Sequence, residues 1–478
     1  MTVRYTPEDL RLFALASHDR NPLHLNAEYA RATPYGEPVV FGILGALACL
    51  GAMPERAGQR LAELTADFQG PMFTGVDYQL RVTDSGSVLG SVLYDGSRKL
   101  VSIQAAFEAG EEASVTWPEA SVKLTEAAMP ELVSGDKVSG TYSPEREALL
   151  QILARFGAGR FALPGAAMAW SSYFVGMEVP GARALFFRLS LAFPPAVKSI
   201  GVPLTYRTEI RSLNSMNLLR TSVQLLLGAA IVAEGETRTL LRPARETGSN
   251  RLTETLLPAS TNLQGKVAVV VGASRGLGAA ISRALILQGC RVHGIFQRSS
   301  SDAMELARQL APNFIPVPGD ALDPDFWAKL REELAQVDYL ICNACPAPLP
   351  YVVEEASASR INAYVTQGLT MTTLPMAAFL GTLTRAEGCL VMVSSIYVET
   401  NPKEFPHYVA LKCAVEGLTR VAAKQNPKVR FLVVRPPKLD TDMTATPSVQ
   451  VKCAPEEIAA SIVLRLDGSL PAGQVVQI

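Results

Sequence analysis

A short apolar run that ends in glycine constrains the fold of this chain more than any other feature. Residues 266–272 read Lys-Val-Ala-Val-Val-Val-Gly, which is typical of a buried strand. Glycines recur at positions 276 and 278, and an alanine-rich helical pattern follows. A strand, a glycine turn and a helix in this order let the backbone approach a pyrophosphate, which then lies on free N–H groups at the helix N-terminus. An ordinary strand-to-helix turn would give the same pattern, so further evidence is needed.

A serine, a tyrosine and a lysine further along the chain supply that evidence. Tyr408 and Lys412 are four residues apart, so they share one face of a helix. A tyrosine hydroxyl normally titrates at about pH 10, and a neighbouring ammonium group favours its phenolate. Ser395 follows the apolar run 389–394 and is placed to hydrogen-bond a substrate carbonyl oxygen while Tyr408 protonates it.

Residues 265–478 resemble a short-chain dehydrogenase/reductase of the ketoacyl reductase kind. The motifs that carry the resemblance are the glycine segment 272–278, Asp320, Asn343-Ala344, Asn362, the Ser–Tyr–Lys set and residues 435–441. The resemblance implies an α/β fold, a Rossmann-type doubly wound parallel sheet. It also implies that Tyr408 is the catalytic acid, that Lys412 modulates it and binds the ribose, that Ser395 orients the carbonyl, and that Asn362 belongs to the proton relay.

The same resemblance implies a cofactor site. Asp320 would face the adenine, Asn343 and Ala344 would line the cleft, and Thr441 would lie near the nicotinamide carboxamide. No acid follows the second strand, where a ribose 2′-hydroxyl would require one, and Arg298 lies there instead. Arg275 precedes the middle glycine of the turn. These two cations suit a 2′-phosphate and so favour NADPH. The complete predicted set is Gly272, Ser274, Arg275, Gly276, Leu277, Gly278, Arg298, Asp320, Asn343, Ala344, Tyr408, Lys412, Pro436 and Thr441.

Several positions depart from the family pattern. Cys345 replaces the usual glycine after Asn343-Ala344, and Pro437 replaces another glycine and removes a backbone donor. These departures concern the substrate lid more than the cofactor site, and a nucleotide-binding domain without catalysis is the alternative. Cys342 and Cys345 also form a C-x-x-C, but they follow a buried strand and do not begin a helix, which argues against a redox motif.

An aspartate and a histidine near the N-terminus form a second candidate site. Asp19 and His24 follow an amphipathic helix predicted over residues 7–17, and Pro22 restricts the loop that carries them. An acid and a base of this kind suit the addition or removal of water at a double bond conjugated to a thioester. The alternative is that Asp19 caps a turn and His24 is structural.

An apolar helix predicted to begin near Gly42 could supply the oxyanion donor that such chemistry needs. Residues 17–44 resemble the hydratase motif of MaoC-like hot-dog proteins, the (R)-specific enoyl-thioester hydratases, in which the aspartate and the histidine are the catalytic pair. Two residues depart from that motif: His18 replaces a small residue, and Phe41 replaces a histidine.

The resemblance implies an α+β double hot-dog ahead of the reductase. We predict a first hot-dog over 1–112, a linker over 113–143, a degenerate second half over 144–246, a linker over 247–264 and the reductase over 265–478. Strands are expected at 66–73, 76–82, 87–93, 101–107, 184–193, 204–212 and 218–227, and helices at 147–156 and 166–175. The second half has no histidine, so it is expected to shape the acyl tunnel; a thioesterase without histidine is the alternative.

Composition excludes several classes of function. The 478 residues carry a formal net charge of −1, which gives no reason to expect binding to nucleic acid or to an anionic membrane. No run of 18 apolar residues and no signal peptide is visible. Seven scattered cysteines fit free thiols in a reducing cytoplasm, and we predict no metal site.

The two resemblances together predict a bifunctional, cytoplasmic enzyme. The reductase would convert a 3-oxoacyl thioester to a 3-hydroxyacyl thioester with NADPH, and the hot-dog would dehydrate it to a 2-enoyl thioester. The acyl group would be carried by acyl carrier protein or CoA in a fatty-acid-like or polyketide-like pathway. The alternatives are a breakdown enzyme, which hydrates enoyl-CoA and oxidises the alcohol, and a ketoreductase with a non-catalytic carrier-docking module. A homodimer is expected from the family.

Overall fold

Two compact units make up the described part of the chain, which covers residues 1–112, 126–195, 203–242, 250–445, 452–466 and 470–478 of a computed structural model. The first unit comprises residues 1–242 and the second residues 250–478. Among the described residues, no helix is both long enough and apolar enough to cross a bilayer.

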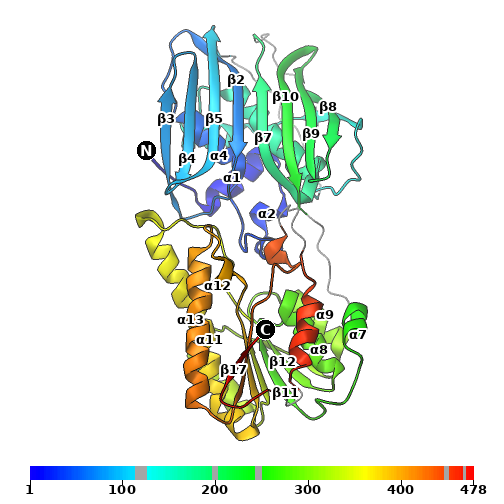
Figure 1. Ribbon diagram of the computed structural model, residues 1–478. Coiled ribbons are helices and arrows are strands. Elements are labelled where there is room, and N and C mark those ends of the chain that lie inside the picture. The colour runs from blue at the N-terminus through cyan, green and yellow to red at the C-terminus, as the bar shows by residue number, and fades with distance from the viewer. Residues whose placement is uncertain (113–125, 196–202, 243–249, 446–451, 467–469) are drawn as a thin grey trace. The chain divides into compact units, whose positions relative to one another are not determined.

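The first unit contains a ten-stranded sheet in which every neighbouring pair is antiparallel. Its strand order is β1-β3-β4-β5-β2-β7-β10-β9-β8-β6, most of which can be followed across Figure 1. The strands are β1 (Thr2–Arg4), β2 (Gln59–Phe68), β3 (Asp77–Asp84), β4 (Val88–Asp95), β5 (Arg98–Ala109), β6 (Lys137–Tyr142), β7 (Ala184–Ala192), β8 (Leu204–Leu213), β9 (Leu218–Leu227) and β10 (Ala230–Leu241).

The order of connections in one half of this sheet repeats in the other. Reading inward from the edges, the halves are β1-β3-β4-β5-β2 and β6-β8-β9-β10-β7. They join where β2 pairs with β7, from Glu63 opposite Ala192 to Asp67 opposite Arg188. The Arg188 guanidinium donates two hydrogen bonds to the Asp67 carboxylate, from Nε to Oδ1 at 2.5 Å and from Nη2 to Oδ2 at 3.0 Å. This bidentate pair favours the observed register at the junction.

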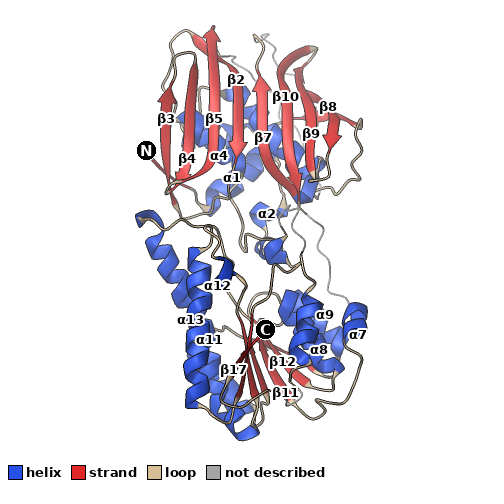
Figure 2. Ribbon diagram, in the orientation of Figure 1, coloured by secondary structure: helices blue, strands red, loops and turns tan. Residues whose placement is uncertain are grey.

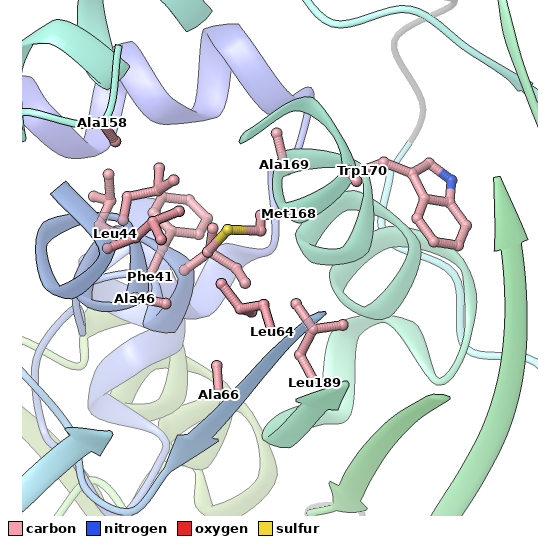
Figure 3. Close-up of a cluster of buried hydrophobic side chains, with 14 of the residues drawn as sticks. Phe41, Leu44, Ala46, Leu64, Ala66, Ala158, Met168, Ala169, Trp170 and Leu189 are labelled. Atoms are coloured by element: carbon pink, nitrogen blue, oxygen red, sulfur yellow. The ribbon is translucent and has the colours of Figure 1, made fainter. Parts of the chain in front are cut away.

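Two apolar helices, α4 (Gly42–Gly51) and α6 (Ala162–Tyr173), pack on one face of this sheet. Neither contains a charged side chain, and a helix that is apolar all round belongs in a core. In Figure 3 their side chains converge above Leu64 of β2 and Leu189 of β7. The remaining helical segments of the unit are α1 (Pro7–Ser17), α2 (Pro22–Leu25), α3 (Ala27–Arg31), α5 (Arg146–Arg155), η1 (Phe174–Glu178) and η2 (Gly181–Arg183).

The second unit contains a seven-stranded parallel sheet of order β13-β12-β11-β14-β15-β16-β17. The order reverses between β11 and β14, which is the point where such sheets bind nucleotides. The strands are β11 (Val267–Val271), β12 (Arg291–Phe296), β13 (Phe314–Pro318), β14 (Tyr339–Cys342), β15 (Cys389–Val393), β16 (Arg430–Val434) and β17 (Val475–Gln477).

Helices cover both faces of the parallel sheet, as Figure 2 shows. Ala268 and Val270 of β11 belong to one buried cluster, and Val269 and Val271 to the other, because successive side chains of a strand point to opposite faces. The helical segments are α7 (Asn250–Leu256), α8 (Gly276–Leu287), α9 (Ser300–Leu310), α10 (Pro324–Glu333), α11 (Glu355–Ala386), α12 (Tyr397–Thr400), α13 (Pro406–Gln425), η3 (Asp442–Thr444) and α14 (Pro455–Val463).

The structure corrects several predicted elements. The linker predicted over 113–143 includes β6, which has only one fully buried residue, Tyr142, and so carries a weak apolar signal; residues 113–125 lie outside the described residues. The linker predicted over 247–264 includes α7. Strand β2 begins at Gln59, seven residues before the predicted start, and the sequence interpretation missed β1 and β10.

Gly51 at the end of α4 offers a test of how tightly the two halves pack. A Cβ at this position would collide with the carbonyl oxygen of Phe156, which is backbone and cannot rotate away. We expect Gly51→Ala to cost about 1–3 kcal/mol, which lowers Tm by about 3–10 °C in calorimetry. Gly159→Ala is the matched control because its Cβ would enter open space. Equal Tm values for the two variants would contradict the close packing.

Candidate active sites

The loop after α1 carries the first candidate site and is anchored by Asn21. This side chain caps α2, since its Oδ1 accepts the Leu23 N–H at 3.0 Å, and its amide nitrogen donates to the carbonyls of Gly176 at 3.0 Å and Gly181 at 3.3 Å. The sequence interpretation placed His24 on a loop, but it lies on the short helix α2, which Pro22 begins. The first half of the unit therefore presents its motif against backbone from the second half.

Asp19 is a buried carboxylate, with 2% of its surface exposed. Its Oδ1 accepts the Asn21 N–H at 3.0 Å, and its Oδ2 accepts the Ser172 hydroxyl at 2.7 Å. Burial raises the pKa of Asp19 to about 6, although both hydrogen bonds oppose the rise. A carboxyl group with this pKa is protonated in part of the molecules near neutral pH.

His24 is held in one tautomer. Its Nδ1 lies 2.8 Å from the Val39 carbonyl oxygen, which can only accept, so Nδ1 carries the proton and Nε2 keeps a lone pair. The imidazole stacks on Phe41 with 3.9 Å between ring centroids. Burial lowers the pKa of His24 to about 4, and the Arg242 charge adds to this effect, so the ring is neutral at pH 7.

Gly42 begins α4, and the preceding residue, Phe41, gives no side-chain hydrogen bond to the helix. The first N–H groups of a helix have no partner within the helix, so this end is a potential oxyanion site. A Cβ at Gly42 would lie 2.8 Å from the Phe68 ring, so glycine allows that ring to close over the helix start.

A cavity of about 430 Å³ brings these groups together. Both halves of the unit contribute to its wall: Asp19, His24 and Gly42 from the first half, and Ser172 and Gly176 from the second. The rest of the wall is mostly apolar: Leu23, Val39, Val40, Phe68, Pro71, Met72, Val101, Val175, Ala184, Leu185, Phe186, Phe187 and Leu240, with Asn21, Tyr35, Gln69 and Gly70. Such a wall suits an uncharged acyl chain.

The glycine turn after β11 forms the second candidate site. Gly272 has φ of +81°, which favours glycine, and lies against Ala344; the amide of Asn343 donates to the Gly272 carbonyl at 3.0 Å. A Cβ at Gly278 would collide with that same carbonyl, and a Cβ at Gly276 would lie 3.2 Å from Thr441. The structure thus gathers these predicted residues around the start of α8, where a pyrophosphate would find free N–H groups.

Ser395, Tyr408 and Lys412 also come together. The Ser395 hydroxyl hydrogen-bonds that of Tyr408, and the Lys412 nitrogen lies 5.4 Å from the Tyr408 ring centroid. Lys412 donates to the Val393 carbonyl at 2.8 Å. Burial raises the pKa of Tyr408, and the Lys412 charge only partly offsets it. The lysine acts in the predicted direction, but the net shift keeps the phenol protonated, as an acid requires.

The two arginines expected at a 2′-phosphate differ in their surroundings. Arg275 already contacts two carboxylates, Asp442 at 3.0 Å and Asp302 at 3.6 Å. Arg298, after β12, is exposed. Asp320, after β13, accepts the Leu322 N–H at 2.9 Å, and the Pro436 carbonyl accepts the Ile396 N–H at 3.1 Å.

Asn362, the residue predicted for the proton relay, lies in the first turns of α11. Its side chain is exposed, on the face of α11 that also exposes Ala358 and Thr366. Tyr364 is buried instead; its hydroxyl lies 2.8 Å from the Pro346 carbonyl and 3.4 Å from the Cys345 sulfur. The continuous helix α11 sets this orientation, which spacing along the sequence does not reveal.

Comparison with known proteins matches each end of the chain to a known family. Residues 266–451 match the model of the short chain dehydrogenase family, and residues 1–103 match the MaoC like domain. The 3-oxoacyl-[acyl-carrier-protein] reductase FabG of Pseudomonas aeruginosa is 30% identical over 197 residues, which are 38% of this chain and 77% of that enzyme. The chain belongs to the short-chain dehydrogenases and carries a MaoC-like domain at its N-terminus.

Other relatives match the same dehydrogenase unit. L-fucose dehydrogenase of Mus musculus is 30% identical over 171 residues, and the chain, with 35% of its own residues, spans 62% of that enzyme's length. The alcohol dehydrogenase of Thermococcus sibiricus, solved with 5-hydroxy-NADP, is 26% identical with a TM-score of 0.40, covering 45% of this chain and 95% of that one. BdcA, solved with NADPH, is 21% identical with a TM-score of 0.40, covering 45% and 94%. At these TM-scores, neither likeness says anything of this chain's substrate.

Sequence reasoning missed two residues of the MaoC-like site, Ser172 and Gly176. Both lie in the half that carries no hydratase motif, and no local signal marks them. No cluster of three potential metal ligands occurs within the described ranges of the chain.

The buried carboxyl group predicts a pH-dependent stability. Because the pKa of Asp19 is about 6 in the folded chain against 3.8 as a model value, the folded chain binds this proton more tightly than the unfolded chain. Stability is therefore lost as pH rises through this interval, by about 3 kcal/mol in full. We expect D19N, which cannot ionise, to raise Tm at pH 8 relative to wild type by about 5–10 °C more than at pH 4. Calorimetry at both pH values checks this, and an equal effect at both would contradict it.

Proposed function

We propose that the chain is a bifunctional enzyme that reduces 3-oxoacyl thioesters with NADPH and dehydrates the resulting 3-hydroxyacyl thioesters to 2-enoyl thioesters. The observation that carries the proposal is the pairing, in one cavity, of a neutral His24 with an open Nε2 and a protonatable Asp19. This acid–base pair is joined to a short-chain dehydrogenase unit. Reduction produces the hydroxyl group that dehydration removes, so one chain serves two consecutive steps.

The environments of the two side chains assign the roles in dehydration. His24 Nε2 takes the proton from the α-carbon, and the N–H groups at the start of α4, near Gly42, stabilise the enolate oxygen. Protonated Asp19 then gives its proton to the leaving hydroxyl group, which departs as water. Transfer of the proton from His24 back to Asp19 restores both groups.

In the reductase unit, Tyr408 gives the proton to the carbonyl oxygen of the substrate. The raised pKa of Tyr408 keeps this proton available. The Ser395 hydroxyl would donate a hydrogen bond to the same carbonyl oxygen of the substrate. NADPH, when bound, supplies the hydride. Side chains at positions 272, 276 and 278 would meet neighbouring atoms, so glycines there leave the backbone N–H groups open to a pyrophosphate. Lys412 would hold the ribose. The exposed Asn362 stays the predicted member of the proton relay, which would connect the site to solvent.

The wider assignment rests on several supports. The relative named as a 3-oxoacyl-[acyl-carrier-protein] reductase supports a substrate on acyl carrier protein or CoA, in fatty-acid-like or polyketide-like biosynthesis. The repeated strand connectivity supports a double hot-dog whose second half carries no independent active site. A homodimer and a cytoplasmic location remain predictions.

The second candidate is a breakdown enzyme that uses NAD. The ion pairs of Arg275 support it, because they occupy one of the two arginines expected to bind the 2′-phosphate of NADPH. Asp302 and Asp442 already contact that guanidinium, which weakens the argument for a 2′-phosphate at Arg275, and oxidation usually uses NAD. This enzyme would hydrate enoyl-CoA and oxidise the alcohol. The two candidates differ in nucleotide and in direction.

Mass spectrometry of a 3-oxoacyl thioester incubated with the protein and NADPH tests the main proposal. We expect wild type to form the enoyl product, D19N to stop at the hydroxyacyl product, and Tyr408→Phe to leave the substrate unreduced, with each rate lowered about 100-fold or more. Wild type that stops at the hydroxyacyl product would leave a reductase with a docking module. NAD-dependent oxidation that exceeds reduction would favour breakdown.

Nucleotide choice gives a separate prediction. If Arg298 binds the 2′-phosphate, Arg298→Ala should raise the Kd of NADPH by about 10- to 100-fold, the loss expected for one charged hydrogen bond, and leave the Kd of NADH unchanged. Fluorescence titration measures both constants. Arg291→Ala, an exposed arginine at the opposite end of β12, is the matched control. Equal losses for both nucleotides would contradict the assignment.

A further inference from the structure

Ser172 lies at the end of α6, in the half of the MaoC-like unit that has no hydratase motif. Its hydroxyl donates to Asp19 Oδ2 at 2.7 Å across 153 residues of sequence, and it also lines the cavity. We propose that Ser172 is a positioning residue of the dehydratase, through which the second half orients the catalytic acid Asp19. The inference rests on the proposed function and assigns to the second half a role beyond shaping the acyl tunnel.

The first step is the geometry of the carboxyl group. Each of its oxygens receives one donor: Oδ1 the Asn21 N–H at 3.0 Å and Oδ2 the Ser172 hydroxyl at 2.7 Å. Two donors on opposite oxygens fix the rotation of the carboxyl plane. The Asn21 N–H can only donate, whereas a hydroxyl can donate to a carboxylate and accept from a carboxylic acid. Ser172 is therefore the one of these two partners that can serve both protonation states.

The second step is the backbone that brings Ser172 into place. Helix α6 ends at Tyr173 and continues as the π-helical turn η1, a form of helix that is frequent at functional sites. Gly176 of this turn lies under the carboxyl group, because a Cβ there would be 2.5 Å from Asp19 Oδ1 and 2.7 Å from Oδ2. The Gly176 carbonyl also accepts the Asn21 amide. The turn therefore contacts both Asp19 and Asn21 of the motif loop.

The third step is the consequence for acidity. In a buried site a hydrogen bond to the charged form of a carboxyl group is strong, because water cannot replace it. The bond from Ser172 lowers the pKa of Asp19 against the larger effect of burial. Removal of the hydroxyl should therefore raise the pKa of Asp19 further and leave the carboxyl plane free to turn. The acid would keep its proton at higher pH but deliver it less well.

Ser172→Ala with Ser171→Ala as the matched control tests the inference. Ser171 is an adjacent buried serine, but its hydroxyl donates to the Ala167 carbonyl of its own helix at 2.8 Å. The readouts are the carboxyl ¹³C titration of Asp19, identified by its loss in D19N, and the pH dependence of kcat/KM for dehydration. We expect Ser172→Ala to move both titrations to higher pH and to lower kcat/KM about tenfold, and Ser171→Ala to change neither.

Ser172→Cys keeps the shape of the side chain, with a slightly larger atom that is a weaker donor, so it should shift the titration in the same direction if the alanine variant does not fold. An unshifted Asp19 resonance in the alanine or cysteine variant would overturn the inference, and so would equal shifts in the Ser171 control. The carboxyl titration needs no turnover. If wild type does not dehydrate, the proposed function fails while the NMR result still decides whether Ser172 orients Asp19.

Discussion

The pairing of β2 with β7 is the contact on which the first unit depends. It joins two five-stranded halves into one sheet, and the Asp67–Arg188 ion pair fixes the register at the junction. The same junction places α4 and α6 on one face, where their apolar side chains share a core (Figure 3). Because α6 ends beside the motif loop, its last turns lie against Asp19. One strand pairing thus decides both the core and the composition of the cavity wall.

Burial then separates the proton affinities of the two motif side chains. It lowers the pKa of His24 to about 4 and raises that of Asp19 to about 6, because a low dielectric disfavours either charge. A neutral base and a partly protonated acid in one cavity suit the proposed dehydration near neutral pH. The Val39 carbonyl completes the arrangement by leaving Nε2, and not Nδ1, as the base. Ionisation of the buried Asp19 carboxyl group lowers the stability of the fold, and the apolar core of the unit offsets that loss.

In the dehydrogenase unit, the reversal of strand order between β11 and β14 assembles the candidate site. It brings the ends of strands that are far apart in sequence to one edge of the sheet, so that Gly272, Asn343 and Thr441 meet around the start of α8. Ser395 lies just after the end of β15, and Tyr408 and Lys412 lie on α13. Most of this site was predictable, because each of its residues lies in a local motif with fixed spacing. The exposure of Asn362 was not predictable, since the rotation of a long helix about its axis depends on packing along its whole length.

Sequence by itself determined several of the elements that carry the candidate residues: the α1 helix and the start of α4 were predicted to the residue, as was β12. It also determined the two families, because their motifs are local. Tertiary structure alone decided that β6 belongs to the sheet, that Asn362 faces solvent and that Ser172 and Gly176 contact Asp19. The physical reason is that a hydrogen bond between residues 153 positions apart leaves no periodic trace in the chain, whereas a turn, a cap or a helical face does.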